Sequence, residues 1–245
     1  RFAEMRRKEV RQKSTKKDTA SICAALNEWE QSQEFDVSFS ISPIEDQQWK
    51  TDLGIYLNNG AKDRAIPIKM SSAPSVLKAI GFSNRDMVIT PATLDKIMGG
   101  KHDLDQTHVE QLATAIHDPI LIVDSATQAG AIVVLTEVKT TQGNVIAAIH
   151  LDKRAHGGVY HVVASAYDKS SPWMIVDQIK AGKLRYLDKK KALVWARDNR
   201  LQLPARIPSS KGSAKVLTPE DVVKLENNQQ NDVGSASDLL VIALP

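Results

Sequence analysis

The extended run from residue 158 to residue 168 carries the side chains best suited to chemistry. Alternation along a strand places a histidine, a serine and a tyrosine on one face: Val159, His161, Val163, Ser165 and Tyr167. The other face is apolar enough for a core: Tyr160, Val162, Ala164 and Ala166. A strand face that is merely solvated carries lysine, glutamate and threonine more often than this set. The pattern therefore predicts a functional site on the first face, continued by Lys169 beyond the strand end.

Two other places combine a cation with a ring. Lys101 and His102 follow two glycines at the end of a predicted helix, where a close backbone, a cation and an imidazole would suit a phosphate. The alternative is a helix C-terminus that favours positive charge by itself, an effect worth about 0.3–1 kcal/mol. Arg185 could bind phosphate through its planar guanidinium and Tyr186 could stack on a base, or the two could be a surface charge and a core ring.

His150 is a further candidate. It faces away from Val145, Ala147 and Ile149 on its strand, and it ranks below His102. The other histidines fit helix surfaces or turns and are assigned no function: His108, His117 and His156. With an ordinary pKa near 6.5, histidine suits proton transfer at neutral pH.

Several familiar catalytic signatures are absent from the sequence. It has no glycine-rich phosphate loop, no pair of metal-binding carboxylates, no His-Glu-x-x-His and no nucleophile elbow. The one cysteine, Cys23, excludes an internal disulfide and a multi-cysteine metal site. Histidine, hydroxyl and cation remain, and these suffice for metal-free cleavage of RNA, because RNA carries its own nucleophile in the 2′-hydroxyl. We therefore expect no metal and no cofactor.

Charge is unevenly distributed along the chain. The formal net charge of the 245 residues is only +3, with 32 basic and 29 acidic side chains. Residues 1–17, however, carry eight basic against two acidic side chains, a local charge of +6. Residues 180–215 carry eleven against two, a local charge of +9, and residues 216–245 are acidic. The middle block predicts a polyanionic partner such as nucleic acid, with a solvated helix face as the alternative.

The elements that must position these residues are helical in the first half of the chain. Residues 1–34 read as a basic helix pair, and a short strand is predicted over 35–41. Ser42, Pro43 and Glu45 form a capping box that begins a helix ending at Asn59-Gly60. Short segments then alternate: 66–70 extended, 74–78 helical, 87–90 extended, 90–98 helical and 108–117 helical.

After Pro119 the hydrophobic period changes from helical to alternating. Four strand-like runs follow with only turns between them: 119–125, 130–140, 144–152 and 158–168. Connections this short cannot contain crossover helices, so the strands are expected to be antiparallel neighbours. A helix over 172–180, an extended LRYL and a helix over 189–199 follow. The predicted fold class is α+β: N-terminal helices, then a four-stranded antiparallel meander sheet, with further helices after the sheet.

Three parts are predicted along the chain. Residues 1–34 form a basic helical connector from a longer parent protein, and residues 35–207 form the main domain, with its sheet at about 119–168. Residues 208–245 form a polar, acidic tail in which 227–237 looks like a loose linker. The longest apolar stretches are far shorter than the roughly 18 residues of a membrane helix, and no signal peptide is apparent. Because the chain begins at Arg1, we expect it to be part of a longer protein.

Seven phrases of the sequence occur in an order that is similar to one known family. They are ISPIEDQQW, SAPSVLKAIG, VITPATLDKIMGGKH, DPILIVDSAT, AIVVLTEV, VASAYDKS and KLRYLDKKKALVWARDNRLQLP. Over roughly residues 41–207 they resemble the C-terminal domain of phage MuF-type head-morphogenesis proteins and of bacterial polymorphic toxins. That domain is placed with the ribonucleases of the barnase, EndoU, colicin and RelE-like fold. The fold that this resemblance implies, helices followed by a four-stranded antiparallel sheet, agrees with the fold class predicted above.

The resemblance implies a metal-independent ribonuclease with a polar site on the sheet face. Three positions match the family's motifs: Lys101-His102, the strand end with Ser165, Tyr167 and Lys169, and Arg185-Tyr186. Two positions depart from it. The family often has asparagine near the position of His161, and glycine is common at the position of Asp168. Roles transfer less safely than fold between members that use different residues for the same cleavage.

We therefore predict an antibacterial effector domain that cleaves RNA, with tRNA among the expected targets, to a 2′,3′-cyclic phosphate and a 5′-hydroxyl. The expected catalytic residues are His102 and His161 for proton transfer, Ser165 and Tyr167 as hydrogen-bond donors to the phosphate, and Lys169 and Arg185 for charge stabilisation. The expected RNA-binding residues are Lys101, Tyr186, Lys189, Lys190 and Lys191.

The expected partners are the RNA substrate, a cognate and acidic immunity protein, and a parent delivery or phage-derived protein, with no membrane. The expected place of action is the cytoplasm of a target bacterium. The alternative is a non-catalytic nucleic-acid-binding or phage-head packaging module, which would account for the basic blocks without any chemistry. A third, weaker prediction is a transferase or nucleotide-modifying toxin, for which no arginine-serine-glutamate arrangement is visible.

Overall fold

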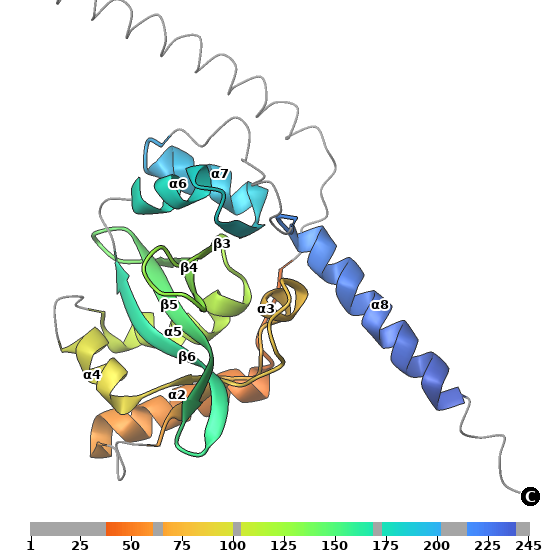
Figure 1. The fold of residues 1–245 in the computed structure, drawn as a ribbon. Coiled ribbons are helices and arrows are strands. Elements are labelled where there is room, and N and C mark those ends of the chain that lie inside the picture. The colour runs from red at the N-terminus through yellow and green to blue at the C-terminus, as the bar shows by residue number, and fades with distance from the viewer. Residues whose placement is uncertain (1–37, 61–65, 100–103, 169–172, 202–214, 239–245) are drawn as a thin grey trace, which may run out of the picture.

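Seven strands form one mixed sheet in the computed structural model, which describes residues 38–60, 66–99, 104–168, 173–201 and 215–238 (Figure 1). The strands are β1 (Ile68–Ser71), β2 (Met87–Ile89), β3 (Leu121–Asp124), β4 (Ala131–Lys139), β5 (Asn144–Ala155), β6 (Gly158–Asp168) and β7 (Leu184–Leu187). Their order across the sheet is β1-β2-β6-β5-β4-β3-β7. All neighbours are antiparallel except β2 and β6, which run parallel.

The sheet corrects the expected four-stranded meander. The predicted meander, β3 to β6, is present and antiparallel. It is extended at one edge by β2 and β1 and at the other by β7. The reason is that β3 and β6 would otherwise be edges with unpaired backbone groups, which the short apolar segments β2 and β7 cover. Residues 38–41, the described part of the strand predicted over 35–41, form no strand.

Most of the described helices begin at side-chain caps that the sequence contains. The helices are α2 (Pro43–Asn59), α3 (Ser75–Ala79), α4 (Pro91–Met98), α5 (Gln106–His117), α6 (Trp173–Lys180), α7 (Lys189–Asp198) and α8 (Pro219–Asp238). The predicted N-cap is confirmed at α2, where the Ser42 hydroxyl accepts the Glu45 N–H at 3.2 Å; the same hydroxyl donates to the Glu45 carboxylate at 3.1 Å. Side chains of Thr90, Asp105 and Asp188 cap α4, α5 and α7, each by accepting the backbone N–H three residues further along the chain.

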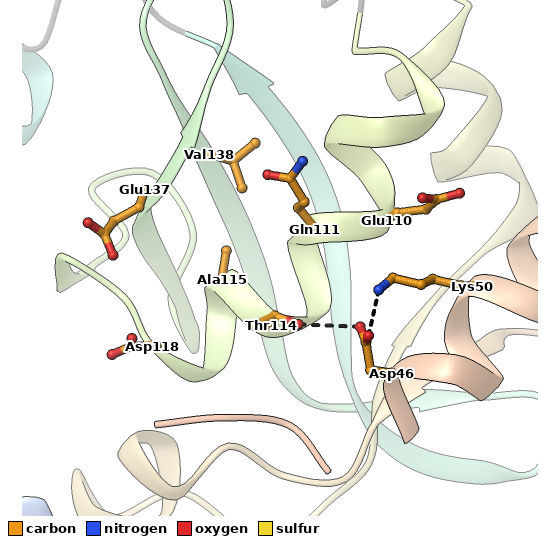
Figure 2. A pocket seen from close by; sticks show the side chains of 9 residues that line it. All are labelled: Asp46, Lys50, Glu110, Gln111, Thr114, Ala115, Asp118, Glu137 and Val138. Carbon is orange, nitrogen blue, oxygen red and sulfur yellow. Dashed lines mark hydrogen bonds and ion pairs between the residues drawn. The ribbon is translucent and has the colours of Figure 1, made fainter. Parts of the chain in front are cut away.

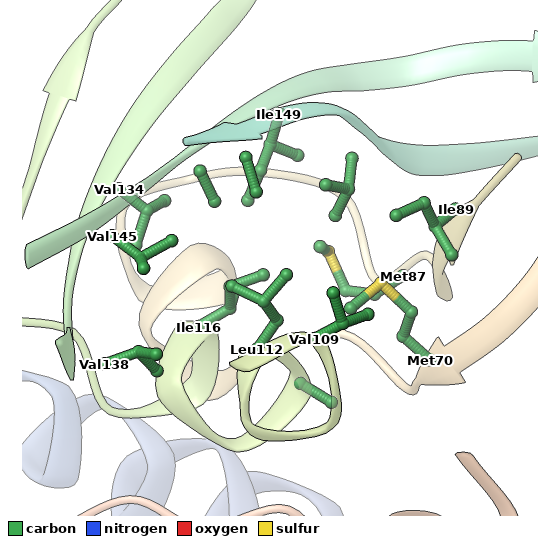
Figure 3. Packing of buried hydrophobic residues seen from close by; sticks show 14 of the residues in the cluster. Met70, Met87, Ile89, Val109, Leu112, Ile116, Val134, Val138, Val145 and Ile149 are labelled. Atoms are coloured by element: carbon green, nitrogen blue, oxygen red, sulfur yellow. The ribbon is translucent and has the colours of Figure 1, made fainter. Parts of the chain in front are cut away.

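Two hydrophobic cores lie on opposite faces of the sheet. The larger one packs α2, α3, α4 and α5 against the sheet, with Trp49, Leu53, Leu112 and Ile116 fully or almost fully buried. Figure 3 shows part of this core, where α5 lies under side chains of the strands. The smaller core packs α6 and α7 over β3, β4 and β7. The face to which a strand residue points can therefore be read from the core that it joins.

The acidic tail begins as part of the folded body. Leu217 bridges to Tyr186 beside β7, and Val222 of α8 is fully buried in the larger core. The expected loose linker over 227–237 is instead helical in α8. The start of this helix is stabilised locally, because the Thr218 backbone N–H donates to the Asp221 carboxylate at 3.1 Å. No helix among the described residues is long and apolar enough to cross a membrane.

Candidate functional site

A β-bulge at Ala164 divides the predicted polar row of β6 between the two faces of the sheet. Ala148 pairs with Ser165, but the next residue of β5, Ile149, pairs with Val163. Ala164 is therefore an extra residue, and the alternation of β6 reverses there. Val163 joins the larger core, whereas Ser165 lies on the face of the smaller core, where the next residue on that face, Tyr167, packs.

His161 lies on the larger-core face of the sheet, opposite Met87 of β2. Its side chain is fully buried. The Asp152 backbone N–H donates to Nδ1 at 3.3 Å, so Nε2 carries the proton and donates to the Ser83 carbonyl at 2.8 Å. Both ring nitrogens are thus bound within the protein. In this arrangement His161 holds the loop before β2 against β6, and neither nitrogen faces solvent.

On the sheet face that carries the smaller core, part of β5 and β6 is not covered by α6 and α7 and is partly exposed to solvent. Four side chains share this face by register and are partly exposed: Ala148, His150, Tyr160 and Ser165. We call these four residues the open strip. His150 and Ser165 are diagonal neighbours across the β5–β6 pair, and neither side chain bonds to another described residue. The sequence had placed His150 on the face opposite Val145, Ala147 and Ile149, which is confirmed.

Tyr167 stands at the boundary between the open strip and the smaller core. Its side chain is half-buried against that core, and this burial raises the pKa of its hydroxyl. The adjacent Asp168 carboxylate accepts from Thr140 of the β4–β5 turn at 2.7 Å. This hydroxyl contact fixes the end of β6 at Asp168. Three of the predicted site residues, Lys101, His102 and Lys169, lie outside the described residues.

Arg185 and Tyr186 lie on β7 at one edge of the sheet, far from Ser165 on the interior strand β6. Four strand spacings separate β6 from β7, a distance of about 19 Å. The Arg185 Nε donates to both carboxylate oxygens of Asp124 at 2.9 Å. Tyr186 is fully buried in the larger core, so its ring is not available for stacking on a base. The structure therefore does not bring this pair to the open strip.

The three lysines at the start of α7 have different surroundings. Lys191 lies 2.6 Å from Asp118 and 3.0 Å from Glu137, and its side chain is 16% exposed. Burial opposes the charge of Lys191, but its hydrogen bonds to these two carboxylates raise its pKa overall. Lys189 is half-buried and Lys190 is exposed. Lys191 is therefore a structural ion-pair partner that is mostly buried, whereas Lys190 is exposed.

An acidic groove, which the sequence analysis did not single out, runs between α2, α5 and β4 (Figure 2). Its volume is about 310 Å³. Its lining has four carboxylates and one amine among small or apolar residues: Asp46, Lys50, Glu110, Gln111, Thr114, Ala115, Asp118, Glu137 and Val138. Figure 2 shows Asp46 between Lys50 and Thr114, with which it bonds at 2.5 and 3.4 Å. The signal in the sequence is the four-residue spacing of Glu110, Thr114 and Asp118.

A buried histidine, which was assigned no function, joins the ends of α2, β1 and α5. The Nε2 of His117 lies 2.9 Å from the Ser71 hydroxyl, and the Glu45 carboxylate accepts from the neighbouring Ser72 N–H at 2.8 Å. Burial lowers the pKa of His117 to about 4, against a smaller opposing effect of Glu45. Burial alone would raise the pKa of Glu45, but hydrogen bonds from Ser72 and Ser42 lower it overall. Because Ser71 and His117 are both buried, this cluster is structural.

No metal-binding group of three or more histidine, cysteine or acidic residues occurs among the residues that the structure describes. Three surfaces among the described residues could take part in chemistry or binding. The first is the open strip, with a histidine, a serine and a tyrosine. The second is the basic side of α6, β7 and α7, of which β7 forms one edge of the sheet. The third is the acidic groove.

Comparison with protein families relates the middle of the chain to a phage domain. Residues 93–193 match the family model of the phage MuF C-terminal domain. This range includes β3 to β7 and the first half of α7, and it excludes α2, β1, β2 and α8. No curated protein and no solved structure matches the chain significantly. The match supports the MuF-type part of the resemblance and does not extend to the ribonuclease superfamily.

Proposed function

We propose that this chain is a nucleic-acid-binding module of a phage MuF-type head protein. The match of residues 93–193 to the phage MuF C-terminal domain supports the association with phage MuF-type proteins. Residues 173–200, which form α6, β7 and α7, carry eight basic against three acidic side chains. This concentration of positive charge on one side of the sheet is the observation that carries the proposal, because lysine and arginine clustered on one face are the electrostatic footprint of nucleic-acid binding.

Six basic side chains of this region lie outside the ion pairs of Arg185 and Lys191. They are Lys180, Lys183, Lys189, Lys190, Arg197 and Arg200, and we call them the basic layer. Lys190 and Arg197 lie two turns apart on one exposed face of α7. Lysine and arginine on such a face contact phosphates without reading bases, so binding should show little sequence preference and strong salt dependence.

The test is binding to duplex DNA and to single-stranded RNA over a range of salt concentrations. The double variant Lys190→Glu/Arg197→Glu should weaken binding at least about tenfold and reduce the salt slope by about two, since each lost phosphate contact removes nearly one unit. The matched control is Lys96→Glu/Lys224→Glu, which reverses two exposed lysines on α4 and α8. Equal weakening by the control pair, or no binding by the unmodified chain at low salt, refutes the proposal.

A metal-free ribonuclease is the second candidate function. Its support is that His150 and Ser165 share the open strip and that their polar groups bond to no other described residue. A histidine would take the 2′-hydroxyl proton, the 2′-oxygen would attack phosphorus, and the bond to the 5′-oxygen would break with protonation of that oxygen. The products are a 2′,3′-cyclic phosphate and a 5′-hydroxyl. Ser165 and Tyr167 would donate hydrogen bonds to the phosphate.

This second candidate is tested by incubating the chain with total bacterial RNA in EDTA and mapping the fragment ends. Discrete fragments with cyclic-phosphate ends are expected, and their loss in Ser165→Ala would place the reaction on the open strip. His102→Ala and His150→Ala then distinguish which histidine transfers the proton. If the RNA stays intact and shows a salt-sensitive mobility shift, the ribonuclease hypothesis is refuted and the nucleic-acid-binding module is the function that remains.

An effector role belongs to the second candidate alone. A toxin acting in the cytoplasm of a target bacterium requires an immunity protein in the producing cell, and the basic layer implies that this protein is acidic. Mixing the chain with an acidic protein encoded beside it should form a complex and block RNA cleavage. If that acidic protein neither binds this chain nor inhibits RNA cleavage, the effector role loses its support.

A further inference from the structure

The acidic groove has the charge and size to accept a basic peptide. Four carboxylates line it against the single amine of Lys50, and Lys191 contributes a second positive charge at one end through Asp118 and Glu137. Between the carboxylates lie the small or apolar side chains of Ala115 and Val138. This combination suits lysine and arginine side chains, whose methylene stems pack on apolar surface while their charged ends meet carboxylates.

The described part of the chain begins at this groove. Ser38 is the first described residue, and its hydroxyl donates to the Asp118 carboxylate at 3.0 Å. The preceding chain therefore joins the body at one end of the groove. The intervening residues 18–37 span at most about 70 Å when fully extended, so the basic residues 1–17 are within reach of the whole groove.

We propose that the acidic groove binds the basic segment 1–17 of the same chain. The local charge of that segment is +6, which is complementary to the groove. Covalent connection raises the effective concentration of the segment to the millimolar range, so several individually weak charge pairs suffice for occupancy. The proposal is independent of nucleic-acid binding. Its consequence is that a polyanion and the groove compete for one basic segment.

The experiment is zero-length carbodiimide cross-linking of the full chain at low salt, with the linked residues identified by mass spectrometry. Lysines of the segment, such as Lys8 and Lys13, should link to Asp46, Glu110 or Glu137. Raising the salt to about 0.5 M should reduce the yield about tenfold, because it shortens the screening length below 5 Å. An equal mixture of isotopically light and heavy chains distinguishes links within one chain from links between two.

Gln111→Lys is the matching variant, because it adds positive charge to the groove and alters no hydrogen bond within the described part of the chain. It should reduce the cross-links severalfold, whereas Gln128→Lys in an exposed loop should leave them unchanged. Three results overturn the proposal. They are absence of cross-links, equal linking to the exposed Asp177 of α6, and links found only between light and heavy chains, which would assign the groove to a second copy.

Discussion

His161 and Ser165 lie four residues apart on β6 but on opposite faces of the sheet, because Ala164 is bulged between them. Uniform alternation would have placed both on one face. Because of the bulge, the two side chains lie in different surroundings. His161 donates to the Ser83 carbonyl of the loop before β2 and accepts from the Asp152 N–H of β5, and Ser165 remains on the open strip beside His150. The histidine in the first half of β6 therefore packs in the core, whereas the serine in the second half lies at the surface.

Replacing His161 should destabilise the fold. His161→Ala leaves a cavity and removes the partners of the Ser83 carbonyl and the Asp152 N–H, so the free energy of unfolding should fall by about 2–4 kcal/mol. Denaturant unfolding followed by circular dichroism measures the change. His150→Ala on the open strip is the control, and its cost should stay below about 1 kcal/mol. Equal costs for the two variants would contradict the different burial of the two histidines.

His117 should make the protein less stable in mild acid. Its folded-state pKa of about 4 lies below the ordinary value of 6.5, so the unfolded chain binds the proton more readily. Stability is therefore complete above about pH 6.5 and falls between pH 6.5 and 4, by up to about 3 kcal/mol. Unfolding midpoints measured over this range check the slope. His117→Gln should flatten it, and an unchanged slope would show that other groups cause the loss.

Lys191 should matter for stability more than its neighbour Lys190. Lys191→Met leaves the carboxylates of Asp118 and Glu137 without their shared cation, which should cost about 3 kcal/mol or more. Lys190→Met changes an exposed side chain and should cost less than about 0.5 kcal/mol. Thermal unfolding of the two variants gives the comparison. For nucleic-acid binding the order should be reversed, with Lys190→Met the weaker binder.

Removing the hydroxyl of Tyr186 should not harm the fold. This buried oxygen has no hydrogen-bond partner among the described residues, and burial first, then the nearby carboxylates of Asp188, Asp118 and Glu220, raises its pKa. Tyr186→Phe therefore removes an uncompensated polar atom, and stability should stay equal or rise by about 1 kcal/mol. RNA binding should be unchanged by the same variant. A clear loss of RNA affinity would mean that the ring leaves the core to stack on a base.

Local chemistry made much of the fold predictable. Ser42, Thr90 and Asp188 each cap a helix by a hydrogen bond between their own side chain and a backbone N–H of the first turn, so no distant residue is required. The alternating runs after Pro119 gave four antiparallel strands for the same reason, since their period and short turns are local properties. Thr218 with Asp221 is an equally local signal for the start of α8, but the prediction of a loose linker rested on polar composition and did not use it.

The residue types, the charge blocks and most element positions of this protein were determined by the sequence alone. Tertiary structure decided which of those residues meet. Pairing of β2 beside β6 buried His161, the bulge at Ala164 turned Ser165 to the other face, and Asp118 and Glu137 converted Lys191 into a structural group. Each outcome depends on a partner distant in sequence, and a shift of one residue in strand register reverses every face that follows it. Helix caps and strand periods lack that dependence, because their partners lie within one turn of the same segment.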